Sequence, residues 1–568
     1  MKKNRSKQSK KRFHDLLLPV IFVLCLMPFI VYLAEFDYGY SRYLWHSDNS
    51  VVQDFYVYYR SAFFFVVLFF VLVILAFQFV LDKAYFKRDK IFYPLVAYLV
   101  FALLSSIFSI NPKAAFLGNL SKQGFFVLAG YVLIAWYAYQ TLREEGDYIS
   151  IFHAILVMFV PLSLIGWLQV FKNDPLSWDF MQRLLMPDEL YEMYGGTVED
   201  IFTGNNVFLT LYNPNYAAIF LVMFACVFFI FFLTAQEKKE KVIAAAFLLD
   251  TLILCWFTYT RAAFVAIVAV TVLFVCMMGR KGKKKVFLTV FAAGVCLLAL
   301  LFVTDAVFFQ GKYKSKIFDE PKTTKLEEIT TTTNGVSIRY DGETFLLTMD
   351  EVADGEIRLP FSGDCYATSV TLDGETEILV RLDEMTLQFV KEDDGYYYRT
   401  DWGKNAQMGE VEAVDLHGYE YLGSGRLYIW SRVLPMLKHY LFVGSGPDTF
   451  AEVYPQDDYV GKLIYAGNAG RIIEGAHNSY LMCFVQTGFL SLVSFLVFAV
   501  CFLKRGFGYY RNCELKTIKE RLGFGCYLGC AGYLVCGIFS DYTLYTTPVF
   551  FIFAGIALAA SSQRKNIK

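Results

Sequence analysis

Long uninterrupted runs of hydrophobic residues, separated by short polar segments, dominate the pattern along this chain. A helix needs about 20 consecutive apolar residues to cross roughly 30 Å of hydrocarbon. Twelve runs meet that length, at residues 16–34, 61–81, 91–110, 123–141, 150–171, 213–234, 242–259, 262–279, 286–306, 477–503, 522–540 and 542–560. The pattern therefore predicts an all-α polytopic membrane protein with about twelve transmembrane helices.

A different pattern fills residues 307–425. Stretches in which polar and apolar residues alternate, such as VSIRY, TFLLTM and TEILVRL, are separated by Asp-Gly turns. This alternation is typical of β-hairpins. We therefore expect a small external β-rich domain at 307–425, inserted between the helices of residues 1–306 and those of residues 477–568. The intervening segment 426–476 is expected to form an external interfacial helix, over 426–441, and a loop.

The distribution of Lys and Arg predicts the orientation in the membrane. The N-terminal segment MKKNRSKQSKKR is strongly basic, and so are the loops QEKKEK, GRKGKKK and KRGFGYYRNCELKTIKER between later spans. Cytoplasmic loops carry such an excess of positive charge. Both chain ends are then cytoplasmic, and residues 35–60, 172–212 and 307–476 lie outside. The segment 172–212 is expected to hold one or two short amphipathic helices on the membrane surface.

Composition agrees with a membrane protein and limits the function classes. Hydrophobic residues make up 56% of the 568 residues and charged residues 18%, and the formal net charge is −1. Of the twelve cysteines, only Cys365 falls in a large external segment, so we expect no external disulfide within the chain. That fits a bacterial cytoplasmic membrane. No zinc-ligand cluster, P-loop or dinucleotide fingerprint occurs, and we expect no cofactor, no metal and no nucleic-acid partner.

Charged residues at the edges of apolar runs on the predicted outer face are the candidates for chemistry. His477 opens the run 477–503, and an imidazole can accept a proton from a hydroxyl at neutral pH. Glu474, three residues upstream, is placed to orient the ring. Arg261 occupies a tight turn between two spans, where a permanent cation needs an anionic partner and its guanidinium suits a diphosphate. The alternatives are a His477 bonded to headgroups or to a carbonyl, and an Arg261 paired with lipid phosphate.

Other residues give weaker indications of a functional role. Arg426 and Arg432 lie on the expected interfacial helix, where snorkelling to headgroups is common. Asp250 falls within the run 242–259, either as a functional group or as a buried partner of a tyrosine or serine. The turn Gly444–Pro447 is either a phosphate-binding set of backbone N–H groups or only a turn.

Four stretches in this order resemble the O-antigen ligase and polymerase superfamily of bacterial membrane glycosyltransferases. They are LYNPNYAAIF, TYTRAAFVAIV, GRLYIWSRVLPMLKHYLFVGSGPDTF and AHNSYLMCFVQTGFLS, the last with Gly488 ten residues after the asparagine. The resemblance covers approximately residues 200–500. One departure is the β-rich insert, since the family's main external loop is usually helical.

The resemblance implies roles for individual residues. His477 is the expected base that deprotonates an acceptor hydroxyl, while Arg261 and Arg426 hold the diphosphate of a polyprenyl-linked donor. The expected substrate-binding residues are Asn215, Trp430, Arg432, Glu474 and Asn478. A single displacement inverts the anomeric configuration, and no metal is needed if the arginines neutralise the leaving group.

The expected function is therefore transfer or polymerisation of an undecaprenyl-diphosphate-linked glycan at the outer face of a bacterial cytoplasmic membrane. The expected partners are the lipid-linked oligosaccharide donor, a glycan or other surface-molecule acceptor, and the bilayer. The sequence leaves polymerase and ligase open. A polysaccharide flippase is the alternative, because twelve spans with both ends inside is also a transporter layout. A receptor that carries the β domain as a binding module would leave the flanking motifs unexplained.

Overall fold

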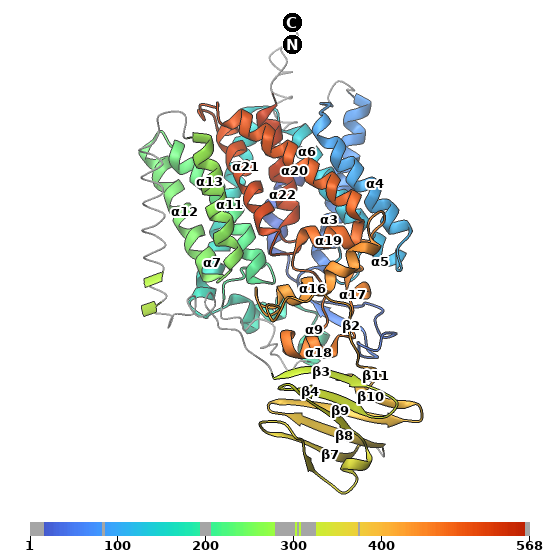
Figure 1. The fold of residues 1–568 in the computed structure, drawn as a ribbon. Coiled ribbons are helices and arrows are strands. Elements are labelled where there is room, and N and C mark those ends of the chain that lie inside the picture. The colour runs from blue at the N-terminus through green and yellow to red at the C-terminus, as the bar shows by residue number, and fades with distance from the viewer. Residues whose placement is uncertain are drawn as a thin grey trace, which may run out of the picture.

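A bundle of helices forms one end of the molecule and a group of β-strands the other (Figure 1). The computed structural model describes residues 16–81, 86–193, 206–278, 302–303, 306–307, 325–372 and 375–562. The long helices are α3 (Tyr58–Leu81), α4 (Tyr93–Ile107), α6 (Phe125–Thr141), α7 (Glu145–Val170), α11 (Pro214–Thr234), α12 (Lys238–Phe257), α13 (Arg261–Met278), α20 (Phe489–Tyr510), α21 (Ile518–Cys536) and α22 (Thr547–Ser561).

Six helices in the described part of the chain are long and apolar enough to cross a membrane. They cover Tyr58–Leu81, Lys90–Ile107, Glu145–Val170, Pro214–Thr234, Arg261–Met278 and Phe489–Tyr510, and shorter apolar helices cover Leu18–Phe29, Phe125–Thr141 and Thr547–Ser561. A mostly helical, multi-pass membrane protein is thus confirmed. Twelve spans stays a prediction, and the expected span 286–306 falls almost entirely outside the described residues.

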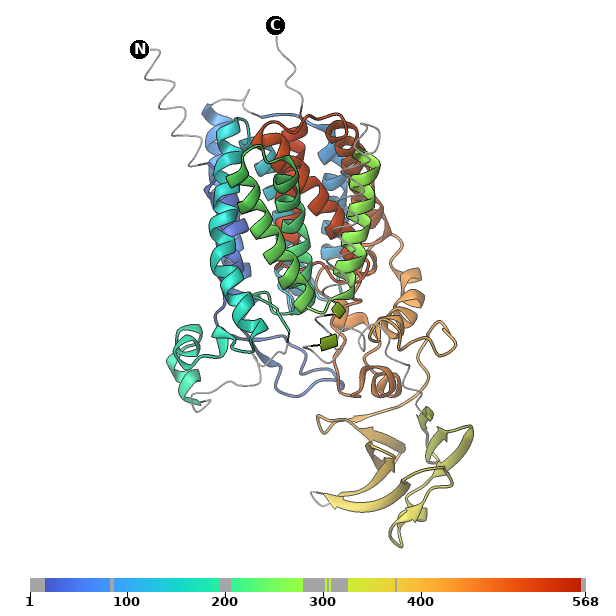
Figure 2. The same cartoon turned by 90° about the vertical axis from the view of Figure 1, so that its left-hand side faces the viewer.

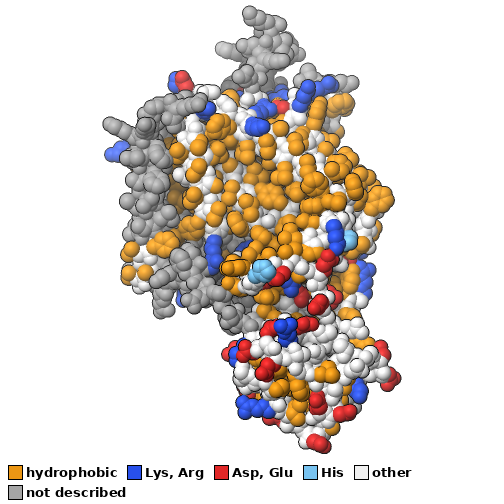
Figure 3. All heavy atoms as spheres, in the orientation of Figure 1, with side chains coloured by type: hydrophobic (Ala, Val, Ile, Leu, Met, Phe, Trp, Pro, Cys, Tyr) orange, Lys and Arg blue, Asp and Glu red, His pale blue; other side chains and the backbone are white. Residues whose placement is uncertain are grey.

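The surface of the bundle is apolar between two polar ends. Hydrophobic side chains cover its sides, and Lys and Arg gather at the end away from the strands (Figure 3). Salt bridges at these basic loops join Arg505 to Asp89 at 2.5 Å and Arg521 to Glu240 at 2.6 Å. This distribution is the one that the positive-inside rule predicts if the strands lie outside. On that prediction we call the strand end of the bundle the outer end.

Close helix packing places α11 in the middle of the bundle. Most of its side chains are buried. On α21, a Cβ added to Gly525 would lie 2.6 Å from Val227 Cα, and one added to Gly529 would lie 2.8 Å from the Met223 carbonyl oxygen. Glycine therefore permits this approach, as small residues commonly do between membrane helices.

The expected single span 477–503 is wrong as a continuous helix. Helix α19 (Ser479–Thr487) ends at Gly488, which has φ +89°, and α20 begins at Phe489. A Cβ on Gly488 would lie 3.0 Å from the carbonyl oxygen of Phe442. The break therefore lets the external 426–476 segment approach the backbone between the two helices.

Two further elements organise the outer end. A hairpin of β1 (Ala34–Asp37) and β2 (Val51–Asp54), which the apolar pattern missed, follows the first apolar helix. The segment 172–193 forms two short helices, α8 (Asp179–Leu185) and α9 (Asp188–Met193), as predicted. These lie at the same end of the bundle as the strands (Figure 2).

The remaining strands lie within the predicted β-rich insert. β3 (Leu326–Thr331), β4 (Val336–Tyr340) and β5 (Glu343–Leu347) form a three-stranded antiparallel sheet. A six-stranded antiparallel sheet has the order β11-β10-β9-β8-β7-β6. Its strands are β6 (Ile357–Arg358), β7 (Cys365–Leu372), β8 (Glu375–Leu382), β9 (Met385–Glu392), β10 (Gly395–Arg399) and β11 (Asn405–Ala406).

Residues from beyond the insert complete the core of these strands. Tyr459 and Ala469 are buried with the inward side chains of the sheets, and the Tyr459 and Tyr398 rings lie 5.1 Å apart. Tyr459 begins the short helix α18 (Tyr459–Gly461). The β domain is therefore packed against the external segment that leads to His477.

We expect Gly488→Ala to destabilise the protein by about 1–3 kcal/mol, because an alanine there is both strained and crowded. Thermal unfolding of the purified protein in detergent measures the effect. Gly508→Ala is the matched control, since Gly508 lies in helix α20 with no atom within 4 Å of an added Cβ. Equal unfolding temperatures for the two variants would contradict this account of the break.

Candidate functional site

His477 and Asp541 form a hydrogen-bonded pair at the outer end of the bundle. The Nδ1 atom of His477 lies 3.0 Å from Oδ2 of Asp541, whose side chain is only 12% exposed, whereas that of His477 is 45% exposed. The backbone N–H of Asn478 donates to Oδ1 of Asp541 at 3.2 Å. One carboxylate thus holds both the imidazole and the loop. An Nδ1–H donated to Asp541 leaves Nε2 with its lone pair.

The local backbone is shaped for this pair. A Cβ on Gly475 would lie 2.6 Å from Oδ2 of Asp541, so only glycine allows the approach. His477 has φ +49°, a left-handed conformation that is uncommon outside glycine and occurs often at functional sites. The Ser479 hydroxyl donates to the Ser540 carbonyl oxygen at 2.7 Å, which fastens the start of α19 to the connection between α21 and α22.

The two arginines predicted for the site each begin a helix. Arg426 is the first residue of α16 (Arg426–Met436), and Arg261 is the first residue of α13. Burial lowers the pKa of Arg426, the charge of Asp541 opposes that shift, and the charge of Arg261 adds to it. Arg426 therefore lies within electrostatic range of both Asp541 and Arg261. His477 contacts Asp541 directly, so two of the predicted residues, His477 and Arg426, are brought to the same carboxylate, whereas a place for Arg261 beside it stays a prediction.

Arg426 has unused hydrogen-bonding capacity. Its Nη1 donates to the Gly423 carbonyl oxygen at 2.8 Å, but its Nε is buried with no hydrogen-bond partner among the described residues. A buried donor without a partner is unfavourable by about 1–3 kcal/mol. An anion bound beside Arg426 would relieve that cost, and the exposed Arg261 would add a second charge.

Glu474 adds a titratable carboxyl group to the site. Its side chain is accessible to solvent, yet the surrounding protein desolvates it and raises its pKa to about 7. The charge of Asp448 adds to that shift, whereas His477 and Arg471 oppose it. Glu474 thus changes charge near neutral pH beside His477.

The other predicted substrate-binding residues have partners within the protein. Trp430 donates its Nε1–H to the Ala476 carbonyl oxygen at 2.8 Å, next to His477. Arg432 pairs with the buried Asp458 at 2.8 Å.

The two predicted asparagines also have partners within the protein. Asn478 caps α19 by accepting from the N–H groups of Tyr480 and Leu481 at 2.9 and 3.0 Å. Asn215 accepts a hydrogen bond from Thr260, the residue before Arg261, at 3.3 Å. Their contact with substrate stays a prediction.

Two weaker candidates are engaged elsewhere. Asp250 accepts from Ser163 Oγ at 2.5 Å and from Trp167 Nε1 at 2.7 Å, which agrees with the alternative of a buried partner. The N–H groups of Gly444 and Gly446 donate to Ser105 Oγ and to the Gln486 carbonyl oxygen. The turn therefore does not offer these groups to a phosphate.

Asp541 is the site residue that sequence reasoning missed. It lies in FSDYTLYT, a tight external turn between two apolar runs, where an ionisable side chain is as conspicuous as Arg261. Asp458 also has a structural role that the sequence did not indicate, because it is buried, accepts from Tyr428 Oη at 2.9 Å and caps α18. Within the described residues no group of three or more His, Cys, Asp or Glu is arranged to hold a metal ion.

A comparison with known proteins supplies independent information. The profile of a family described as O-antigen ligase matches residues 394–496, which include Arg426, Trp430, Arg432, Glu474 and His477. No curated protein and no solved structure gives a significant match. The stretches 211–220 and 258–268 lie outside the matched region, so their assignment stays a prediction. The match confirms the resemblance of this chain to the O-antigen ligase and polymerase superfamily, a family of glycosyl-transferring membrane enzymes.

Proposed function

We propose that this protein polymerises or transfers a glycan from a polyprenyl-diphosphate donor to an acceptor hydroxyl, without a metal and with inversion. The observation that carries the proposal is the His477–Asp541 pair, with Arg426 within electrostatic range of both Asp541 and Arg261. The O-antigen ligase match over residues 394–496 supports the class of reaction.

In the proposed reaction, Nε2 of His477 accepts the proton of the acceptor hydroxyl. The acceptor oxygen attacks the anomeric carbon, and the bond from that carbon to the diphosphate oxygen breaks with its electron pair. The products are the new glycoside, the polyprenyl diphosphate and a protonated His477, which the carboxylate of Asp541 stabilises through Nδ1–H. Attack from the side opposite the leaving group inverts the configuration.

Arg261 and Arg426 are proposed to bind the diphosphate. Two guanidinium groups held near each other in the free protein repel each other. A dianion bound beside them attracts both groups and offsets this repulsion. Each also begins a helix, where the helix dipole favours negative charge. Because the charges are fixed before the substrate arrives, they stabilise the negative charge that develops on the leaving group.

The proposed location is the outer face of a bacterial cytoplasmic membrane. The basic loops lie at the end of the bundle opposite the strands, and His477 lies at the strand end with α16 and α19 (Figure 1). A lipid-linked donor would present its diphosphate at that depth, where α13 begins.

The function is tested with purified protein in liposomes that contain polyprenyl-diphosphate-linked repeat units from the native host. A ladder of glycan products identifies a polymerase, and glycan that appears only with a second acceptor identifies a ligase. Movement of the donor between leaflets, with no new glycosidic bond for any acceptor, would instead establish the flippase alternative.

We expect His477→Ala to lower the transfer rate by about 10²–10⁴-fold, because it removes the general base. Asp541→Asn should lower it at least about tenfold, because an amide does not stabilise a protonated imidazole. His417→Ala is the matched control, since His417 also lies 3.0 Å from an aspartate, Asp415, but is 83% exposed. Wild-type rates in folded His477→Ala protein would exclude it from the site.

A chelator should leave the transfer rate unchanged, because Arg261 and Arg426 supply the positive charge that a divalent cation would otherwise provide. The assay is repeated with and without EDTA, followed by added Mg²⁺ or Mn²⁺. Strong inhibition that the metal reverses would overturn the metal-free mechanism.

Glu474→Gln should change how the stability of the protein depends on pH. Because the folded-state pKa of Glu474 is raised to about 7, the wild type loses stability relative to the glutamine variant as pH rises from about 4.5 through 7. The variant should therefore unfold at a higher temperature than wild type at pH 8, with the difference shrinking towards pH 5. A difference that does not vary with pH would contradict the raised pKa.

A further inference from the structure

Aromatic side chains from two distant parts of the chain meet where the β1–β2 hairpin approaches the β domain. Trp402, in the turn between β10 and β11, stacks on His46 with ring centroids 6.0 Å apart and planes at 17°. Trp45 stacks on Tyr43 at 4.7 Å and 14°. Trp402 is 44% exposed and Trp45 is half-buried. We call these four residues (Tyr43, Trp45, His46 and Trp402) the aromatic platform.

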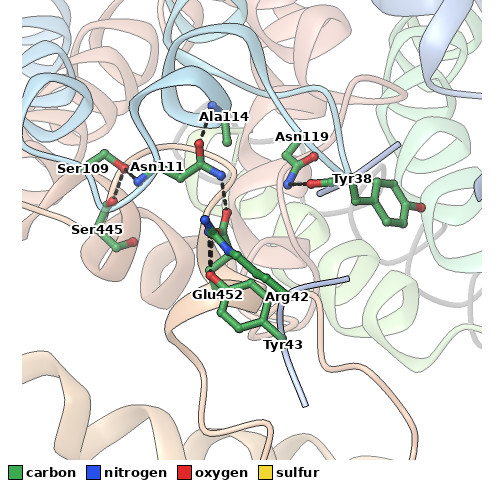
Figure 4. Close-up of polar contacts among 9 residues, drawn as sticks. All are labelled: Tyr38, Arg42, Tyr43, Ser109, Asn111, Ala114, Asn119, Ser445 and Glu452. Carbon is green, nitrogen blue, oxygen red and sulfur yellow. Dashed lines mark hydrogen bonds and ion pairs between the residues drawn. The ribbon is translucent and has the colours of Figure 1, made fainter. Parts of the chain in front are cut away.

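The part of the platform that lies on the β1–β2 hairpin is held to the outer end of the helical bundle. Arg42 Nη2 and Tyr43 Oη donate to the same Glu452 carboxylate oxygen at 2.8 and 2.9 Å, and Asn111 Nδ2 donates to its other oxygen at 2.9 Å. Figure 4 shows these side chains converging on Glu452. Because the Glu452 side chain is fully buried, its negative charge is stable only with these hydrogen-bond donors beside it.

The β-domain side is fixed to the hairpin by one lysine. Lys404 Nζ donates to the carbonyl oxygens of Ser41 and Tyr43 at 2.7 and 3.1 Å and pairs with Asp48 at 2.9 Å. Lys404 follows Trp402 by two residues. The indole of Trp402 is thus held in place before any ligand binds, which lowers the entropy cost of binding.

The chemistry of the platform fits a carbohydrate. The face of an indole is negatively polarised and attracts the weakly positive C–H groups that line one side of a sugar ring. Exposed charged and polar groups surround the rings, with Asp48 at 89% and Arg42 at 58% side-chain exposure, and they can bond sugar hydroxyls. Aromatic rings with a few polar groups at their rim are a common form of small-ligand site.

Other occupants fit less well. A stable protein interface buries about 800 Å² on each partner. The apolar surface of the platform consists of only two indole rings among charged residues, which is a small target for a protein. A bilayer surface is disfavoured because β2 and β11 lie beyond the apolar part of the bundle (Figures 1 and 3).

The platform is also connected to the proposed active site. Tyr40 packs edge-on against Trp45 at 5.3 Å and lies 5.6 Å from Tyr38. Glu452, which accepts from Arg42 and Tyr43, lies four residues before Gln456. The Gln456 side chain accepts from the Ile473 N–H at 3.0 Å and donates to the Ile473 carbonyl oxygen at 2.8 Å. The segment that holds the hairpin therefore also holds the loop that carries Glu474 and His477.

We propose that the aromatic platform binds glycan, and that its ligand is the saccharide chain of the acceptor or of the growing product. The choice of that ligand rests on the proposed function. A chain held here would keep its reacting end near His477 between additions. The β insert would then serve as part of an extended glycan-binding surface.

Equilibrium dialysis tests the proposal with full-length protein in nanodiscs. The probe is the oligosaccharide released by mild acid from the host's own lipid-linked donor and labelled at its reducing end. We expect Trp402→Ala to weaken binding at least tenfold and Trp45→Ala to weaken it several-fold, while Trp402→Tyr retains most of it. Trp178→Ala is the matched control, because Trp178 is similarly exposed (41%) but precedes α8.

Binding of the probe by Trp402→Ala at wild-type affinity, or no binding by the wild type, would overturn the platform. Unfolding temperatures of all variants show whether a loss of binding reflects loss of structure, and if Trp402→Ala does not fold, unchanged binding by folded Trp45→Ala overturns the platform. The liposome transfer assay is run in parallel. Binding without transfer would overturn the proposed function and leave the platform, whereas transfer without binding would do the reverse.

Discussion

A carboxylate that is largely withdrawn from water, such as that of Asp541, requires partners, and the outer end of this protein is organised by how it obtains them. One oxygen faces the His477 imidazole and the other accepts the Asn478 N–H group. These contacts fix where α19 starts and how it meets the connection between α21 and α22. They also require a glycine at Gly475 and a left-handed backbone at His477. Local strain at this loop is balanced by the satisfaction of one buried charge.

A second buried carboxylate, that of Asp458, links the helix of the site to the β domain. It binds Tyr428 and Arg432 on α16 and caps α18, whose first residue lies in the core of the strands. Arg426, the first residue of α16, therefore begins a helix that contacts with Asp458 hold in place. The position of Arg426 near Asp541 therefore depends on how α16 is held by Asp458.

The sequence predicted those features that arise from neighbouring residues. Apolar runs and alternating stretches are local, so the helical bundle and the strands could be predicted from them. Arg261, Arg426 and His477 were recognised because a charge at the edge of an apolar run is conspicuous. What was missed depends on contacts between distant residues. Asp541 meets His477 across 63 intervening residues, and the break at Gly488 is explained only by the approach of Phe442.

The same distinction explains the turn Gly444–Pro447 and the hairpin. The N–H groups of the turn looked available because their acceptors, Ser105 and Gln486, lie elsewhere in the chain. The β1–β2 strands are four residues each, too short for a clear alternation. Their position is set by Glu452 and Lys404, which belong to other segments.

The contribution of Tyr459 and Ala469 to the core of the strands has a mechanical consequence. A module joined only by its two covalent ends would swivel, and tension on it would be lost in the linkers. Here the strands also pack against a segment that lies between α16 and His477. Any tilt of the β domain must therefore move that segment too. Drag from a long polymer attached to the β domain would be transmitted as a torque to the helix that begins with Arg426.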